Sequence, residues 1–436
     1  MIEHKRGAVP HMRAISASSK ANRKSGSSAK GNENSSAFPA EELTAVRSAL
    51  LHWYRQNRRI LPWRDTGDPE DVWISEIMLQ QTRVEAVKGY FTRFRKALPD
   101  AFAIAACPED RLMKLWEGLG YYNRARNLQK CAEVLVRDYG GKLPADHASL
   151  LRLPGIGPYT AGAIASIAFG IPVPAVDGNV LRVWSRLTSC ADDISLEATK
   201  QKYASEIQVL LEEKGDRDPS PVSFISDLTQ ALMELGAVVC VPNGAPLCES
   251  CPLRSFCRAR AAGPALSLPV KAAKKPRRVE ERTILVLRDA DRFFFRKRPS
   301  RGLLAGLYEF PGFPGRLTPE EALDAARSLG ADPVRIAPLP EGKHIFTHVE
   351  WHMTAYEVLV SAFPGSENKN GTLSLTREEL RSFAVPSAFR TWTDWYALRS
   401  FPSEAAVLHL RIGQGEKHLR GSDQVPEVPG PGGLIG

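Results

Sequence analysis

The sequence predicts two folded domains of different class, an all-α domain followed by an α+β domain. Between residues 39 and 258, apolar residues recur three or four positions apart, and polar or Gly/Pro-rich segments separate these stretches, as is typical of amphipathic helices. From about residue 282 onward, β-branched and aromatic residues gather in short runs that predict strands. At 436 residues, the chain is long enough for about two to three domains.

Changes in composition set the predicted boundaries. Residues 1–36 are rich in Ser, Lys, Asn and Gly and have almost no large apolar side chains, so we expect a disordered basic tail. The helical domain spans 37–258, and a linker rich in Ala, Pro, Lys and Arg spans 259–281. The α+β domain spans 282–400, and the Pro/Gly-rich stretch 401–436 is expected to be a second flexible tail.

Eight segments of the first domain have helical periodicity. In chain order they are "EELTAVRSALLHWYRQN", "DVWISEIMLQQTRVEAVKGYFTRF", "PEDRLMKLWEGL", "NRARNLQKCAEVLVRDYG", "ASLLRL", "YTAGAIASIAFG", "DGNVLRVWSRL" and "SFISDLTQALMELGAVVC". In the second domain, "RTILVLRD", "RFFFRKRP" and the long "HIFTHVEWHMTAYEVLV" predict strands. "TPEEALDAARSLG" predicts a helix between them, and a short helix is expected near residues 378–383.

The net charge of +9 is concentrated in two segments. Residues 1–36 carry seven Lys or Arg against two Glu, and residues 258–282 carry eight against two, which leaves −2 for the rest of the chain. Bulk charge therefore supports nucleic-acid binding only weakly, and a DNA contact of the folded part must use local clusters and backbone amides. Because no run of about 20 apolar residues is uninterrupted and the N-terminus lacks a secretory apolar core, we expect an intracellular protein with no membrane segment.

Four of the seven cysteines lie within eighteen positions, in "CVPNGAPLCESCPLRSFC". Cys240, Cys248, Cys251 and Cys257 have the spacing C-x7-C-x2-C-x5-C. In a chain without an export signal, such clustering favours metal ligation by thiolates over disulfide bonds. Four thiolates suit either a tetrahedral Zn²⁺ or a [4Fe–4S] cluster, and the spacing leaves both open.

The segment "LRLPGIGPYTAGAIASIAF" predicts a helix end, a tight hairpin and a second, very apolar helix. Gly155 and Gly157 let the backbone approach a ligand closely, and the helix that begins near Pro158 presents unpaired amides at its N-terminus. Those amides and the helix dipole favour an anion such as a phosphate without any basic side chain. A simple tight turn between two helices is the alternative.

An acidic motif follows this hairpin. In "VDGNV", Asp177 begins a new helix, and capping the helix is the commonest role of an aspartate at that position. The hairpin, this aspartate and the four-cysteine cluster, in this order, resemble the helix-hairpin-helix superfamily of DNA base-excision glycosylases. The resemblance implies a helix-hairpin-helix fold for the all-α domain and a [4Fe–4S] cluster rather than zinc.

One position distinguishes branches of this superfamily. Members that also cut the DNA backbone carry a lysine just after the hairpin as a Schiff-base nucleophile, whereas this chain has Tyr159, which cannot form an imine. Over most of residues 50–258, the segments "LPWR", "VWISEIMLQQTRV", "GLGYYNRARNL", "LPGIGPYTAGAI" and "VDGNVLRV" resemble adenine DNA glycosylases of the MutY type. The resemblance implies a monofunctional, monomeric enzyme of the bacterial cytoplasm that removes adenine opposite 8-oxoguanine or guanine in double-stranded DNA.

Two carboxylates are the candidates for catalysis. Glu76 lies one helical turn from Val72 and Leu79, so its carboxyl is held on an otherwise apolar face, where desolvation should raise its pKa. A raised pKa suits a general acid near neutral pH. The resemblance implies that Glu76 protonates N7 of adenine and then activates water, and that Asp177 stabilises the positive sugar, as in two-carboxylate glycoside hydrolysis. It also implies that Tyr159 and Asn179 complete the pocket.

Other residues are expected to meet the DNA. An enzyme that acts on a base within a duplex must extrude that base and fill the gap. The resemblance assigns this role to the "QQT" and "GLGYY" segments, which makes candidates of Gln80, Gln81, Thr82, Leu119 and Tyr121. The arginines near these segments, Arg83, Arg124 and Arg126, are candidates for phosphate contacts.

The second domain resembles Nudix pyrophosphohydrolases through "GLLAGLYEFPGF". Its helix has Ala325-Ala326-Arg327-Ser328 where those enzymes need glutamates for Mg²⁺, so hydrolysis is not expected. The domain instead resembles the 8-oxoguanine-sensing module of adenine glycosylases, in which a Phe-Ser-His loop probes the oxidised base. Phe346, Thr347 and His348 match that loop, and the threonine keeps the hydroxyl but adds a methyl group.

Two other functions compete with this interpretation. An endonuclease III-like bifunctional glycosylase for oxidised pyrimidines is opposed by Tyr159 and by the second domain. A non-catalytic iron–sulfur DNA-binding protein is opposed by the presence of both Glu76 and Asp177. The chain also departs from the family in having seven rather than six residues between its first two cluster cysteines, so that this loop must bulge.

Overall fold

The computed structural model describes residues 37–212, 221–273, 276–361, 363 and 371–397. The predicted tails 1–36 and 401–436 lie outside this part of the chain. Over the described ranges, no helix combines the length and the apolar character needed to cross a membrane.

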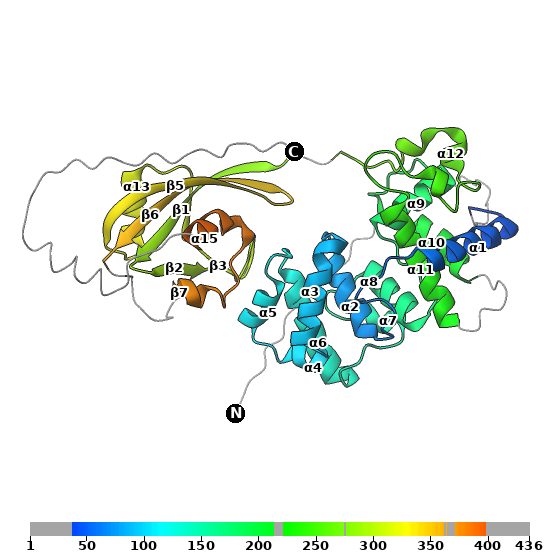
Figure 1. The fold of residues 1–436 in the computed structure, drawn as a ribbon, viewed down its shortest axis with the longest axis horizontal. Helices are drawn as coiled ribbons and strands as arrows, with labels where there is room; N and C mark the ends of the chain where they lie inside the picture. The colour runs from blue at the N-terminus through cyan, green and yellow to red at the C-terminus, as the bar shows by residue number, and fades with distance from the viewer. Residues whose placement is uncertain (1–36, 213–220, 274–275, 362, 364–370, 398–436) are drawn as a thin grey trace, which may run out of the picture. The chain divides into compact units, whose positions relative to one another are not determined.

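The first domain is helical, as the periodicity predicts (Figure 1). Its α-helices are α1 Ala40–Asn57, α2 Pro69–Leu79, α3 Val84–Ala97, α4 Ala101–Ala105, α5 Glu109–Trp116, α6 Asn123–Tyr139, α7 His147–Leu150, α8 Pro158–Ala163, α9 Gly178–Thr188, α10 Glu197–Glu212, α11 Pro221–Val238 and α12 Arg258–Ala262. Helix α8 continues into a π-helical turn at Ile164–Ala168.

These helices enclose two separate apolar cores. One core lies among α2, α3, α5 and α6 and contains Trp73 and Trp116, both fully buried. The other lies among α1, α9, α10 and α11 and contains Trp184 and Tyr203. Because α2 belongs to the first core and α9 and α11 to the second, a site between these helices draws side chains from both halves of the domain.

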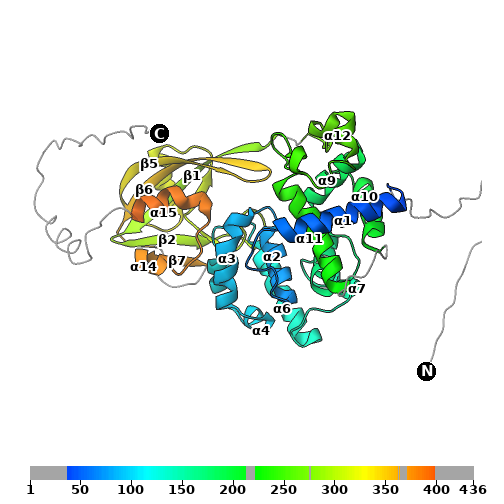
Figure 2. The same cartoon turned by 45° about the vertical axis from the view of Figure 1, so that its right-hand side comes forward.

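The second domain is built on a seven-stranded mixed sheet in the described residues (Figures 1 and 2). The strands are β1 Arg278–Asp289, β2 Arg292–Lys297, β3 Tyr308–Glu309, β4 Gly312–Pro314, β5 Pro333–Ile345, β6 Val349–Val360 and β7 Thr372–Thr376. The main path runs β3-β2-β1-β6-β5, and β1 and β6 are parallel.

Helices cover the two faces of this sheet. Helix α13 (Pro319–Ser328) packs against one face of β1 through Leu285 and Leu287, and α15 (Arg390–Ala397) packs against the other through Ile284 and Val286. Short helical turns lie at Arg377–Leu380 (α14) and Ser387–Phe389. The α+β prediction is therefore confirmed.

The strand prediction was wrong at one place that matters for the site. The stretch "HIFTHVEWHMTAYEVLV" is not one strand, because the chain turns at residues 346–348 between β5 and β6. Strand β5 was not predicted, since Pro333, Pro338 and Pro340 normally interrupt sheet structure. Strand β5 lies at the end of the sheet order, where proline without an N–H is tolerated.

Candidate active site

A cavity of about 330 Å³ lies between the two halves of the helical domain. It takes side chains from α2, from the segment after α1, and from α8, α9 and α11. Its lining includes Arg59, Trp63, Arg64, Glu76, Gln80, Gln81, Thr82, Tyr159, Asp177, Asn179, Met233 and Glu234. The structure therefore brings together all four predicted catalytic residues and the three residues of the predicted QQT loop.

Glu76 is a buried carboxyl in the wall of this cavity. It projects from α2, which begins at Pro69 after the N-cap Asp68, and only 7% of Glu76 is exposed. The Tyr159 hydroxyl donates a hydrogen bond of 2.5 Å to Glu76 Oε2. Burial raises the pKa of Glu76 to about 7, because desolvation and the charge of Asp177 outweigh the opposing effect of the Tyr159 hydrogen bond.

Asp177 is the N-cap of α9 and also lines the cavity. One of its oxygens accepts from the Val180 amide at 2.7 Å, and the other accepts from Asn179 Nδ2 at 2.8 Å. Burial raises the pKa of Asp177, and these hydrogen bonds oppose that rise. Gly236 on α11 is needed for this packing, since a Cβ there would lie 2.6 Å from Asn179 Cβ.

Arg182 bonds to Asn179, which in turn bonds to Asp177, and this role was not predicted from the sequence. Its Nη2 donates to Asn179 Oδ1 and to the Gly236 carbonyl, both at 2.8 Å, and its Nε donates to the Cys240 carbonyl at 2.8 Å. One guanidinium thus joins the start of α9, the end of α11 and the first cluster cysteine.

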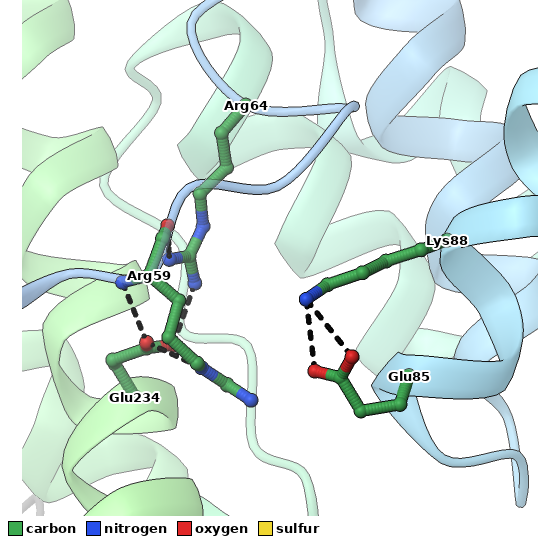
Figure 3. Close-up of polar contacts among 5 residues, drawn as sticks. All are labelled: Arg59, Arg64, Glu85, Lys88 and Glu234. Carbon is green, nitrogen blue, oxygen red and sulfur yellow. Dashed lines mark hydrogen bonds and ion pairs between the residues drawn. The ribbon is translucent and has the colours of Figure 1, made fainter.

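The sequence analysis also missed an ionic group in the lining of the cavity. Arg59 and Arg64, both in the segment after α1, converge on Glu234 of α11 at 2.7 Å each. Burial alone would raise the pKa of Glu234, but the two arginines lower it to about 2. On the neighbouring helix α3, Lys88 and Glu85 pair with each other rather than with this group (Figure 3).

The predicted hairpin adopts the expected backbone. Gly155 has φ +76°, and a Cβ there would lie 2.6 Å from Asn127 Cβ, so a larger residue does not fit. Gly157 is the N-cap of α8 and Pro158 is its first residue, with open space where a Gly157 side chain would be. The phosphate contact proposed for this hairpin stays a prediction.

The two predicted base-reading loops follow α2 and α5. Gln80 Nε2 donates to Thr160 Oγ1 at 3.4 Å, and Gln81 and Tyr121 both have positive φ, 60° and 47°. Tyr121 is half exposed, whereas Leu119 is 5% exposed and packs in the first core. Their roles in reading DNA stay predictions.

The phosphate role expected for Arg124 is wrong. Arg124 is buried, and its guanidinium donates to the main-chain carbonyls of Gln80 in one loop and Leu119 in the other instead of facing outward. Arg126, two positions later, pairs with Glu109 at 2.7 Å.

The four clustered cysteines line one cavity beside α9 and α12, together with Arg186, Arg254 and Arg260. Arg186 Nη1 lies 3.3 Å from Cys240 Sγ. In the described residues, no group of three or more His, Cys, Asp or Glu side chains is placed to hold a single metal ion. The donor set nevertheless fits a polynuclear cluster, since four thiols face a shared cavity with a guanidinium donating to one sulfur.

The loop Phe346-Thr347-His348 forms the turn between β5 and β6. The Phe346 amide donates to the Val349 carbonyl at 2.8 Å, and the Phe346 ring packs edge-on against Trp351 with a centroid distance of 4.7 Å. Thr347 and His348 are exposed at the tip. A partly buried ring therefore anchors a turn whose two polar residues are exposed.

Two family models match the chain. A model described as HhH-GPD superfamily base excision DNA repair protein matches residues 74–209, and a NUDIX domain model matches residues 283–394. Among solved structures, one described as a thermostable thymine-DNA glycosylase has a TM-score of 0.45 and 28% identity, covering 51% of this chain and 98% of that chain.

Similar curated proteins match over most of the sequence. The adenine DNA glycosylase of Homo sapiens is 35% identical over 410 residues, which cover 80% of this chain and 73% of that protein. The adenine DNA glycosylase of Buchnera aphidicola subsp. Baizongia pistaciae is 33% identical over 342 residues, which cover 78% of this chain and 93% of that protein.

Proposed function

Because this chain belongs to the adenine DNA glycosylase family, we propose that it hydrolyses the N-glycosidic bond of adenine paired with 8-oxoguanine or guanine in duplex DNA. The observation that carries the mechanism is a buried Glu76, bonded to Tyr159 and facing the same cavity as Asp177. At about 330 Å³, this cavity is within the usual range for small ligands and admits an extruded base. The direct test is base release from duplexes with A opposite 8-oxoguanine, G or T.

Glu76 acts first as a general acid. Its carboxyl proton moves to N7 of the extruded adenine, the bond between the sugar C1′ and N9 breaks, and the electron pair leaves with the base. A pKa of about 7 keeps a large share of Glu76 protonated near neutral pH, as this step requires. The Tyr159 hydroxyl fixes the carboxyl in position and stabilises the carboxylate that results.

Asp177 acts next as a negative charge beside the positive sugar. Asn179, held by Arg182, orients the Asp177 carboxylate toward the cavity. The Glu76 carboxylate then takes a proton from water, whose oxygen forms a bond to C1′. This returns Glu76 to its protonated form and leaves an abasic site in the DNA.

Recognition of the oxidised base is proposed for the exposed tip of the β5–β6 turn. The base opposite adenine lies outside the adenine cavity, so a separate surface must read it. Replacing His348 with Ala should lower the preference for A:8-oxoguanine over A:G by about tenfold to a hundredfold, because one specific base contact contributes about 1–3 kcal/mol. The ratio of excision rates on the two duplexes, measured at one salt concentration, gives this preference.

His352→Ala is the matched control, since His352 lies on β6 outside the turn and pairs with Glu350. It should leave the ratio unchanged. An unchanged ratio in folded His348→Ala would show that this loop does not discriminate between the two bases.

We propose that Cys240, Cys248, Cys251 and Cys257 hold a [4Fe–4S] cluster. Such a cluster supplies a rigid cross-link between the segment after α11 and the residues before α12, and it takes no part in the steps above. Protein purified without oxygen should be brown, with about four iron atoms per chain and a broad absorption band in the blue. Colourless protein with one zinc per chain would contradict this proposal.

A further inference from the structure

Arg124 is a buried cation that contacts both predicted base-reading loops. It lies in the first turn of α6 and is 9% exposed. Its Nη1 donates to the carbonyls of Ile77, Met78 and Gln80 at 2.9, 2.8 and 2.6 Å. Its Nη2 donates to Thr82 Oγ1 at 3.2 Å and to the carbonyls of Leu119 and Gly120 at 2.9 and 3.1 Å.

The first of these groups belongs to the C-terminal end of α2. The last carbonyls of a helix lack partners within the helix, and a cation placed there also interacts favourably with the helix dipole. Helix α2 has no basic residue in its own last turn. Arg124 supplies that cation from another helix, at the end of the helix that carries Glu76.

The second group joins two segments that are distant in sequence. Nη2 alone bridges Thr82, in the loop after α2, and Leu119 and Gly120, in the loop after α5. Each loop contains a residue with left-handed backbone, Gln81 and Tyr121, and this conformation is unfavourable for any residue except glycine. Both loops therefore need external support to keep these shapes.

The charge of Arg124 is balanced mainly by carbonyl dipoles. Over the described part of the chain, no carboxylate contributes to its electrostatic environment, and burial lowers its pKa. The guanidinium also packs 5.4 Å from the Trp116 ring centre and 5.6 Å from that of Tyr121. An ammonium group has three donors and no planar fork, so lysine cannot make these contacts together.

We propose that Arg124 is a positioning residue that fixes the two loops as one unit, so that both meet the mispair in a single geometry. This inference rests on the proposed function, in which these loops displace and read bases. Arg124 thus contributes to the recognition of adenine that is paired with another base, whereas Glu76 and Asp177 perform the chemistry.

Arg124→Lys tests the proposal with two duplexes. One has adenine opposite G, and the other has adenine opposite an abasic-site analogue, where no partner base must be separated from adenine or read. Because a misplacement of about 1 Å can cost about a hundredfold in rate, we expect excision from A:G to fall by about tenfold to a hundredfold. For adenine opposite the abasic analogue, the fold-reduction in excision rate should be at least about five times smaller than for A:G, since that substrate depends less on the loops.

Arg137→Lys is the matched control, because Arg137 lies on the same helix and forms only an exposed pair with Asp138. It should leave both rates unchanged. An equal loss on both duplexes in Arg124→Lys, or no loss, would overturn the proposal. Failure of the unaltered protein to release adenine from either duplex would instead overturn the proposed function.

A second measurement covers the case in which Arg124→Lys does not fold. Thr82→Val removes one acceptor of the Arg124 guanidinium and nearly preserves side-chain shape. If Arg124 couples the loops, hydrogen exchange of the backbone amides at 117–122 should become several-fold faster, although the substitution lies in the other loop. Faster exchange near residue 82 alone would contradict the coupling.

Discussion

Replacing Glu76 with Gln should slow adenine release from A:8-oxoguanine duplexes by about a hundredfold to ten-thousandfold while mispair binding persists. An amide keeps the shape of the carboxyl and still accepts the hydrogen bond from Tyr159, but it has no acidic proton for N7. Single-turnover excision and duplex binding should be measured on the same preparation. Full activity of the variant would remove Glu76 from the mechanism.

The pH dependence of the unaltered enzyme gives an independent check. Glu76 must be protonated to act, so excision should fall as pH rises through about 7. Asp177 must be ionised, and its raised pKa should place the acidic limb above the ordinary range of an aspartate. The two carboxyls interact, so the apparent values belong to the pair. A rate that stays constant from pH 6 to pH 9 would contradict this assignment.

The free energy of unfolding of Glu76→Gln, measured at two pH values, shows that the variant is folded and tests the raised pKa of Glu76. A carboxyl whose folded pKa is raised from 4.5 to about 7 destabilises the protein progressively as pH rises between those values. Above pH 7 this destabilisation has reached its full size, because the buried carboxyl is then ionised. Glu76→Gln should therefore have a higher free energy of unfolding than the unaltered protein at pH 8 and no advantage at pH 4.

Asp177→Asn should lower adenine release by about a hundredfold to a thousandfold. The substitution removes the negative charge beside the developing sugar cation, and losing one such electrostatic group has effects of this size. Asparagine caps helices about as well as aspartate, so α9 and the thermal stability should be preserved. The excision rate and the unfolding midpoint together separate the chemical role from the structural one.

The control for Asp177→Asn is Asp146→Asn. Asp146 caps α7 by accepting from the Ser149 amide at 2.7 Å and lies outside the adenine cavity. Both variants lose one capping charge, but only Asp177→Asn should lose activity. Equal activity of the two would mean that Asp177 serves only as an N-cap.

Several features of the site could be predicted because they depend on residues close together in sequence. Helical periodicity places Glu76 on an apolar face, and its raised pKa follows from that burial. The glycine hairpin and the Asp177 N-cap are local conformations and formed as expected. The resemblance placed a loop at residues 346–348, where the turn between β5 and β6 lies. The residue pattern did not predict strand β5 before it, because an edge strand accepts prolines that a local pattern treats as breaks.

The sequence by itself determined the two fold classes, the chemical groups of the adenine site and the presence of four clustered thiols. Tertiary structure alone decided which charged groups became internal supports. Arg124 bonds to acceptors up to 47 positions away, and Arg59 pairs with Glu234 at a separation of 175. A periodic pattern states which helix face is buried but not which partners lie opposite it. An arginine that solvates a helix surface and one that joins two loops therefore look alike until the helices are packed together.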